Sequence, residues 1–97
     1  MTDHLADTAD ATAWRLAEPA VLDTLREDAA AGGILTATLR AFADADLSAT
    51  GAAAALGVHA NTVHHRLDRL RARTGRNPRR FHDLAELLTA ARMLAGG

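Results

Sequence analysis

The apolar positions of the chain follow the spacing of α-helices, because they recur three, four or seven residues apart and would share one helical face. Pro19 suits the first turn of a first helix, and Gly32-Gly33 end it. A second helix is expected from there to about Asp44. The two stripes consist of Val21, Leu22 and Leu25, and of Leu35, Leu39 and Phe42.

A third, short helix is predicted after Ser48, which is a favourable N-cap residue. It runs through consecutive alanines at 52–55 and ends at Leu56. Gly57 follows and can take the left-handed conformation that turns the chain. We therefore expect a helix, a sharp turn and then a further helix in this part of the sequence.

A longer helix is expected from about Ala60 to Arg73, with Thr74-Gly75 closing it. Its buried face would consist of Val63, Leu67, Leu70 and Thr74. Asn77-Pro78 would cap a last helix. The stripe of that helix would consist of Phe81, Leu84, Leu88, Ala91 and either Leu94 or Ala95. Since no strand pattern occurs, the sequence predicts a small all-α domain of about five helices.

The composition supports one folded helical domain. The 97 residues are 48% hydrophobic but only 3% aromatic, so a core of aliphatic residues and alanine is expected, which favours helix over sheet. No apolar run approaches the roughly 20 residues of a membrane span. Residues 1–13 are weakly patterned. We expect them to form a flexible leader, and residues 14–97 to form the domain.

The net charge of −1 conceals two oppositely charged halves. Up to Leu47, nine acidic residues and three arginines give a net charge of −6. From Ser48 onward, eight arginines and three acidic residues give +5. A basic second half suggests a polyanionic partner.

Residues 48–70 carry the pattern of a helix-turn-helix. Two helices that cross at a steep angle need small residues where they approach each other, and Ala52 and Ala53 meet that need. Gly57 permits the turn between them. The space between the helices would be filled by Leu56, Val58, Val63 and Leu67. The predicted fold is thus homeodomain-like and lacks a wing.

Helical periodicity directs Asn61, His65 and Asp68 away from this core. A helix inserted in the major groove of duplex DNA would offer Asn61 or His65 to base edges, while hydroxyls and arginines would reach phosphates. The predicted DNA-binding residues are Ser48, Thr50, His59, Asn61, Thr62, His64, His65, Arg66, Arg69 and Arg71.

A set of short blocks, of which His59-x-Asn61-Thr62 is the most distinctive, resembles one known family. The blocks are Leu35-x-x-Thr38-Leu39-Arg40-Ala41-Phe42, Leu47-Ser48-Ala49-Thr50, Ala55-Leu56, Val58-His59-x-Asn61-Thr62-Val63, Arg66-Leu67-x-Arg69-Leu70 and Thr74-Gly75. Over about residues 15–95 the chain resembles the C-terminal helix-turn-helix domain of PucR/CdaR-type transcriptional regulators. The resemblance implies a regulator that binds promoter DNA as a dimer or larger oligomer, with sensory regions elsewhere in a longer chain.

The chain departs from this family on the outward side of the predicted recognition helix. The family commonly has basic residues where this chain has Ala60, His64 and Asp68, and an aromatic residue where it has His65. Asp68 would repel phosphates unless it accepts from a cytosine amino group or pairs with a neighbouring arginine. Protonated imidazoles of His59, His64 and His65 could replace the lost charge, so we expect tighter DNA binding at pH 6 than at pH 8.

Other chemistry is not indicated by the sequence. The chain lacks cysteine, a His-x3-His pair, a serine nucleophile motif and a glycine-rich phosphate loop. We therefore expect no enzyme, no metal site and no cofactor. The predicted function is that of a cytoplasmic, homodimeric, sequence-specific DNA-binding domain. The alternative is a helical protein-interaction or dimerisation module with a degenerate DNA-binding face.

Overall fold

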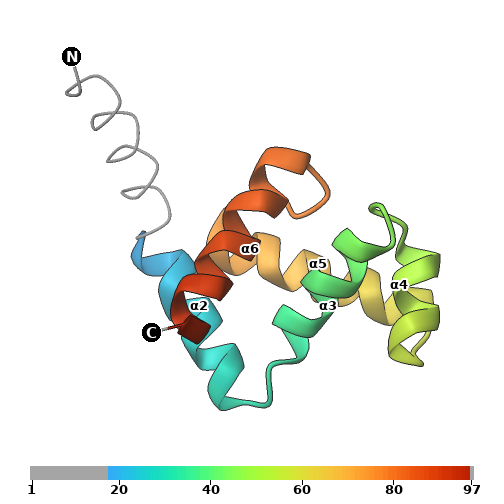
Figure 1. Cartoon of the computed structure of the whole chain (residues 1–97), viewed down its shortest axis with the longest axis horizontal. Helices are drawn as coiled ribbons and strands as arrows, with labels where there is room; N and C mark the ends of the chain where they lie inside the picture. Colours follow the sequence, from blue (N-terminus) through green and yellow to red (C-terminus); the bar gives the residue numbers. More distant parts are fainter. Residues whose placement is uncertain (1–17, 97) are drawn as a thin grey trace.

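Five helices make up most of residues 18–96, the part of the chain that the computed structural model describes. They are α2 (Pro19–Ala30), α3 (Ile34–Asp44), α4 (Ala49–Leu56), α5 (Ala60–Thr74) and α6 (Phe81–Gly96), and Figure 1 shows their arrangement. No strand occurs in these residues, so the predicted all-α helix-turn-helix fold is confirmed. The predicted leader, residues 1–13, lies outside the described residues.

The ends of the central helices follow local sequence signals. Ser48 caps α4, because its hydroxyl accepts a hydrogen bond from the backbone N–H of Gly51 at 3.0 Å. Gly57 ends α4 in the left-handed conformation, with φ at 69°. Gly75 does the same after α5, with φ at 73°. Both glycines stand where a residue with a side chain would be strained.

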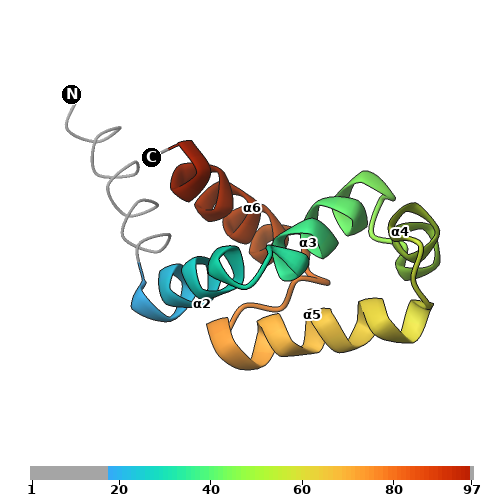
Figure 2. The same cartoon turned by 90° about the horizontal axis from the view of Figure 1, so that it is seen from below.

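The core lies where α2 and α3 pack between α5 and α6. Figure 2 shows α5 along one side of the molecule and α6 on the other, and both helices contact the pair between them. The fully buried side chains of this core are led by Leu39 from α3, Leu67 and Leu70 from α5, and Leu87 from α6. None of the described helices is long and apolar enough to cross a membrane.

The junction of α2 and α3 is held by a buried carboxylate. Gly33 occupies the N-cap position of α3 and has no side chain with which to cap it. Asp28, only 4% exposed, accepts hydrogen bonds from the backbone N–H groups of Leu35 at 2.8 Å and Thr36 at 2.9 Å. The Thr36 hydroxyl also donates to Asp28 at 2.8 Å. Asp28 therefore caps α3 from the preceding helix.

The start of the last helix differs from the sequence prediction. Asn77-Pro78 do not begin a helix but form a turn, and α6 starts at Phe81. The Asn77 side-chain oxygen accepts from the backbone N–H of Arg79 at 3.1 Å, and its carbonyl accepts from that of Arg80 at 2.9 Å. These bonds close a tight turn, in which asparagine is as favourable as it is at a helix cap.

The predicted apolar stripe of this helix was wrong at its first residue. Phe81 is 70% exposed and makes an edge-to-face contact with His82, with ring centroids 5.8 Å apart. Because the helix starts at Phe81 itself, this side chain lies at the very beginning of α6, and the buried positions begin one turn later. They are Leu84, Leu87, Ala90 and Ala91, with Leu88 and Leu94 partly buried against the core.

Candidate nucleic-acid interface

α5 is anchored by one face and presents the other to solvent. Its buried residues are Val63, Leu67, Leu70 and Thr74, as predicted. The opposite residues Asn61, His65 and Asp68 are exposed. The outward orientation expected for these three side chains is therefore confirmed, and α5 carries a polar ridge over its N-terminal half.

The turn between α4 and α5 sets the angle at which this ridge is presented. Ala52 is fully buried and Ala53 nearly so, which lets α4 pack closely against the neighbouring helices α3 and α5. The backbone N–H of Val58 donates to the Ala53 carbonyl at 3.0 Å and closes the turn after Gly57. Small residues and a left-handed glycine thus produce the helix-turn-helix arrangement that their order in the sequence predicts.

His59 has a structural role at the beginning of α5. It is the N-cap residue, and its Nδ1 accepts a hydrogen bond from the backbone N–H of Asn61 at 3.1 Å. Nδ1 is therefore unprotonated in this arrangement. The cap holds the first turn of α5, and with it the exposed Asn61 side chain.

One side of the outer face of α5 forms an open hollow of about 490 Å³. It is lined by Thr62, His65, Arg66 and Arg69. The Arg66 guanidinium donates to the hydroxyl of the buried Thr38 of α3 at 3.3 Å. This contact braces Arg66 against the neighbouring helix, while Arg69 remains exposed.

On the other side of α5, Asp68 pairs with an arginine from the turn before α6. Arg79 Nη1 lies 2.9 Å from the Asp68 carboxylate. Arg79 Nη2 lies 3.2 Å from Nδ1 of His64 and 3.4 Å from the His64 carbonyl oxygen. Since a guanidinium can only donate, Nδ1 of His64 accepts here. The sequence allowed a neighbouring arginine as the partner of Asp68 but did not single out Arg79.

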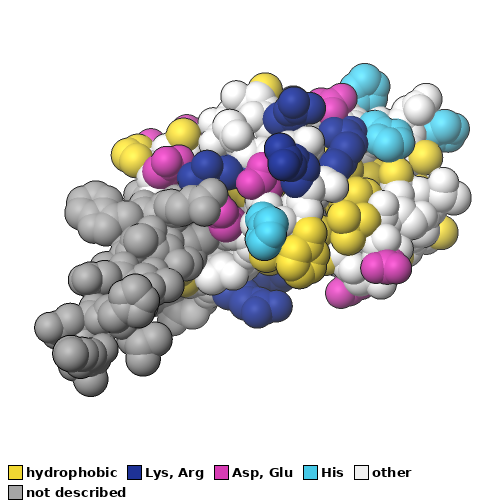
Figure 3. Space-filling view, turned by 90° about the horizontal axis from the view of Figure 1, so that it is seen from above, with side chains coloured by type: hydrophobic (Ala, Val, Ile, Leu, Met, Phe, Trp, Pro, Cys, Tyr) yellow, Lys and Arg dark blue, Asp and Glu magenta, His cyan; other side chains and the backbone are white. Residues whose placement is uncertain are grey.

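The predicted DNA-binding residues fall on two helices and the turn before α5. Thr50 and Arg71 are exposed, on α4 and α5 respectively, and Ser48 is engaged as the cap of α4. Figure 3 shows histidine side chains gathered at one end of one face of the molecule, with arginine side chains next to them. Most of the predicted residues therefore lie on α5, where imidazole and guanidinium groups are concentrated.

Two other arginines of the basic half are tied to carboxylates. Arg76 lies 3.0 Å from Glu18 and 3.2 Å from Glu86, and its side chain is only 17% exposed. Arg73, in the last turn of α5, lies 3.7 Å from Glu27 of α2. Some of the acidic residues and arginines therefore form ion pairs that join α2 to α5 and α6.

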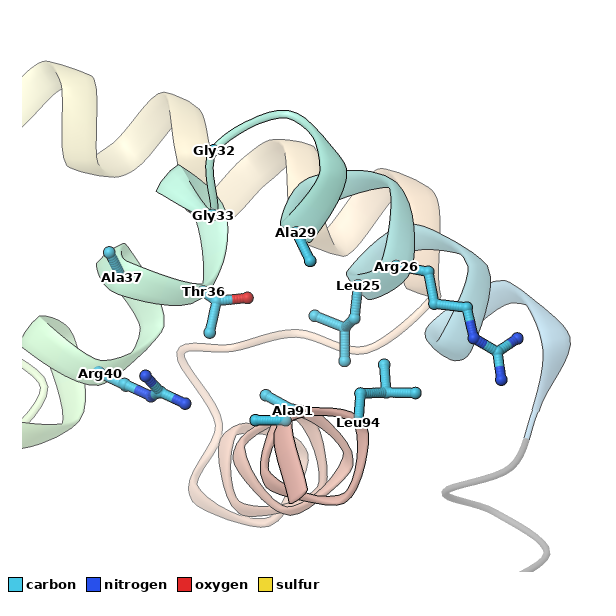
Figure 4. Close-up of a pocket in the computed structure, with 11 residues that line it drawn as sticks. Leu25, Arg26, Ala29, Gly32, Gly33, Thr36, Ala37, Arg40, Ala91 and Leu94 are labelled. Carbon is cyan, nitrogen blue, oxygen red and sulfur yellow. The ribbon is translucent and has the colours of Figure 1, made fainter. Parts of the chain in front are cut away.

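A separate groove lies between α2, α3 and α6 (Figure 4). Its volume is about 580 Å³, and Leu25, Ala91 and Leu94 contribute apolar side chains to it. Arg26 and Arg40 also line it, and they lie at opposite sides in the close-up. No residue of α5 lines this groove, so it is a different surface from the ridge of α5.

Comparison with known protein families assigns the chain. The sequence model of the PucR C-terminal helix-turn-helix domain matches residues 35–93, which include α4, α5, nearly all of α3 and most of α6. Neither a curated protein nor a solved structure matches the chain. The family match covers more than half of the 97 residues, and it includes the turn, the capped α5 and the ridge described above. The chain therefore belongs to the family of PucR C-terminal helix-turn-helix domains.

Proposed function

We propose that this chain is the DNA-binding domain of a transcriptional regulator and inserts α5 into the major groove of duplex DNA. The observation that carries the proposal is the exposed ridge of α5, on a helix-turn-helix scaffold whose family is that of a regulator domain. An α-helix fits the major groove, where each base pair presents a distinct set of donors and acceptors.

Asn61 and His65 are the proposed readers of base edges. Both are exposed on the first two turns of α5, the part of a recognition helix that usually lies deepest in the groove. An asparagine amide can donate to N7 and accept from the N6 amino group of adenine, so Asn61 favours an A·T pair. His65 can donate to or accept from a base according to its protonation.

Phosphate contacts are proposed for the residues beside these readers. Arg66 and Arg69 would reach one strand, together with the hydroxyl of Thr62. Ser48 and Thr50 begin α4, where free backbone N–H groups also favour phosphate. The remaining proposed contacts are His59, His64 and Arg71. Contacts of this kind fix the register of the protein on DNA without reading sequence.

The assembly and location that follow are also proposals. A homodimer would place two copies of α5 about 34 Å apart, which matches one turn of B-DNA and predicts a palindromic site. A DNA partner implies a cytoplasmic location, with which a chain without cysteine is compatible. Sensory regions in a longer protein would control such a domain.

The experiment is selection of bound duplexes from a random pool, followed by titration of the selected duplex at 50 and 200 mM NaCl. We expect a selected sequence, and an affinity that falls steeply with salt because bound phosphates release counterions. The Asn61→Ala variant should lose the selected preference, while Arg92→Ala on α6 should keep it. Absence of binding even at 50 mM NaCl would reject the proposal and favour a protein-interaction module.

A further inference from the structure

The two sides of the outer face of α5 differ in charge. One side carries three arginines, and the other carries a carboxylate and a single arginine. The first side consists of Thr62, Arg66, Arg69 and Arg73, and the second consists of His64, Asp68 and Arg71. A helix in the major groove lies between the phosphates of both strands. The second side of α5 therefore offers less positive charge to the phosphates of the DNA strand that it would face.

Arg79 supplies positive charge to this second side from outside the helix-turn-helix. Its guanidinium lies between Asp68 and His64, with Nη1 2.9 Å from Asp68 and Nη2 3.2 Å from His64 Nδ1. These contacts use Nη1 and Nη2, so the Nε–H group is not engaged in them. The Arg79 side chain is 31% exposed and can be reached by a ligand.

The turn before α6 fixes the backbone from which this side chain projects. The backbone N–H of Arg79 donates to the side chain of Asn77, and the N–H of Asn77 donates to Asp83 at 2.9 Å. Pro78, between them, is fully buried. These contacts hold the backbone of the turn, and the guanidinium itself contacts Asp68 and His64 of α5.

We infer that Arg79 binds the phosphate backbone of DNA on the His64 and Asp68 side of α5, on the strand opposite the one that Arg66 and Arg69 contact. The inference rests on the proposed function, since it adds a contact to the same interface. Asp68 is a positioning residue in this arrangement. It holds Arg79 against α5, and both side chains are partly open to solvent, Asp68 at 64% and Arg79 at 31%, so a phosphate can approach the guanidinium while the ion pair is kept.

Two other arginines near this turn are paired with carboxylates elsewhere. Arg76 is enclosed by Glu18 and Glu86. Arg73 pairs with Glu27 in the last turn of α5, away from the N-terminal turns that would enter the groove. Arg79 is the arginine that comes from a different element and lies against the outward residues of α5.

The test is a salt titration of the full chain on the duplex that wild-type protein selects from a random pool, with an unrelated duplex for comparison. Arg79→Ala should lower the slope of log affinity against log salt by about 0.9, the value for one lost phosphate. The ratio of the affinity at 50 mM NaCl to that at 200 mM NaCl should therefore be about threefold smaller in this variant than in the wild type. The loss should be equal on both duplexes, because phosphate contacts carry no base information.

Two further variants make the result decisive. Arg79→Gln keeps side-chain donors for Asp68 and His64 but removes the charge, so it should reproduce the lowered slope even if Arg79→Ala unfolds. Arg26→Ala on α2 removes an exposed arginine elsewhere and should leave the slope unchanged. A wild-type slope in Arg79→Gln would overturn the inference while leaving the proposed function intact. Failure of the wild-type chain to bind any duplex would instead overturn the function itself.

Discussion

Asp28 Oδ2 accepts two hydrogen bonds from Thr36, one from its backbone N–H at 2.9 Å and one from its hydroxyl at 2.8 Å. The other carboxylate oxygen accepts from the backbone N–H of Leu35. A charged acceptor at the start of α3 also interacts favourably with the helix dipole. The Asp28 side chain of α2 thus accepts hydrogen bonds from the free N–H groups in the first turn of α3. The N-cap residue of α3 is a glycine and has no side chain that could accept them.

Replacing Asp28 with alanine should therefore destabilise the domain. One buried and one partly buried backbone N–H group and a hydroxyl would lose their acceptor, and we expect the free energy of unfolding to fall by about 2–4 kcal/mol. Urea denaturation followed by circular dichroism measures the change. Asp23→Ala, at an exposed position of the same helix, should change stability by less than about 0.5 kcal/mol. Equal losses in the two variants would contradict the capping role.

Gly57 should tolerate asparagine better than alanine. Its φ of 69° is left-handed, and a Cβ added there meets no atom within 4 Å, so the penalty comes from backbone strain alone. We expect Gly57→Ala to lower the free energy of unfolding by about 1–2 kcal/mol. Gly57→Asn should lose less, because asparagine adopts this conformation more readily. The comparison of the two thermal or urea transitions tests the turn, and an equal loss would indicate a steric cause.

Removal of the Asn61 amide should relax the choice of base at one position. If Asn61 contacts adenine, Asn61→Ala should reduce discrimination at that position by about 1–3 kcal/mol while keeping the salt slope. Arg69→Ala should behave in the opposite way, with a smaller slope and unchanged base preference. Affinities for the selected duplex and its single-base variants measure both effects. A uniform loss across all variants of the duplex would assign Asn61 to the DNA backbone.

The expected pH dependence should be carried mainly by His65. Nδ1 of His59 and Nδ1 of His64 already accept hydrogen bonds, whereas within residues 18–96 no hydrogen bond to His65 is found. A proton on His65 adds positive charge to the face of α5 that is proposed to lie against polyanionic DNA, so the DNA-bound state favours it and affinity should fall as the pH rises from 6 to 8. Arg66 and Arg69 line the same hollow.

Binding at pH 6 and pH 8 in the same salt measures this effect. His65→Gln should remove most of the difference, while His59→Asn, which keeps a capping side chain, should retain it. Equal wild-type affinity at both pH values would contradict the expectation. A pH dependence that survives in His65→Gln would assign the titration to another group.

The sequence predicts the helices well because their signals are local. Each helix-end signal affects only the backbone within a few residues: Ser48 caps the start of α4, and Gly57 and Gly75 end α4 and α5. The spacing of Val63, Leu67 and Leu70 identifies the buried face of α5. The turn at Asn77 was misassigned because asparagine followed by proline suits both a tight turn and a helix start. In the structure the Asp83 carboxylate accepts a hydrogen bond from the Asn77 N–H, a contact that joins the turn to α6 and that the two residues Asn77-Pro78 do not predict.

The interface was predicted less completely because some of its contacts join residues far apart in the sequence. Arg79 lies 15 residues from His64, and no periodicity relates the two. Arg66 reaches Thr38, which is 28 residues away. Likewise, Asp28 was counted as one acidic residue of a charged half, although its carboxylate is buried at a helix junction. Such relationships depend on how the helices pack.

The cap formed by His59 limits how the outward surface of α5 can be redesigned. A library that varies residues 61, 64, 65 and 68 samples side chains on the outward surface of α5. A library that also varies His59 would alter the first turn of α5, because Nδ1 of His59 holds the backbone of Asn61. Members without a capping side chain at this position would lose that hydrogen bond, at a cost of about 1 kcal/mol in stability. New binding preferences are best sought with His59 kept constant and with Asp68 and Arg79 varied together.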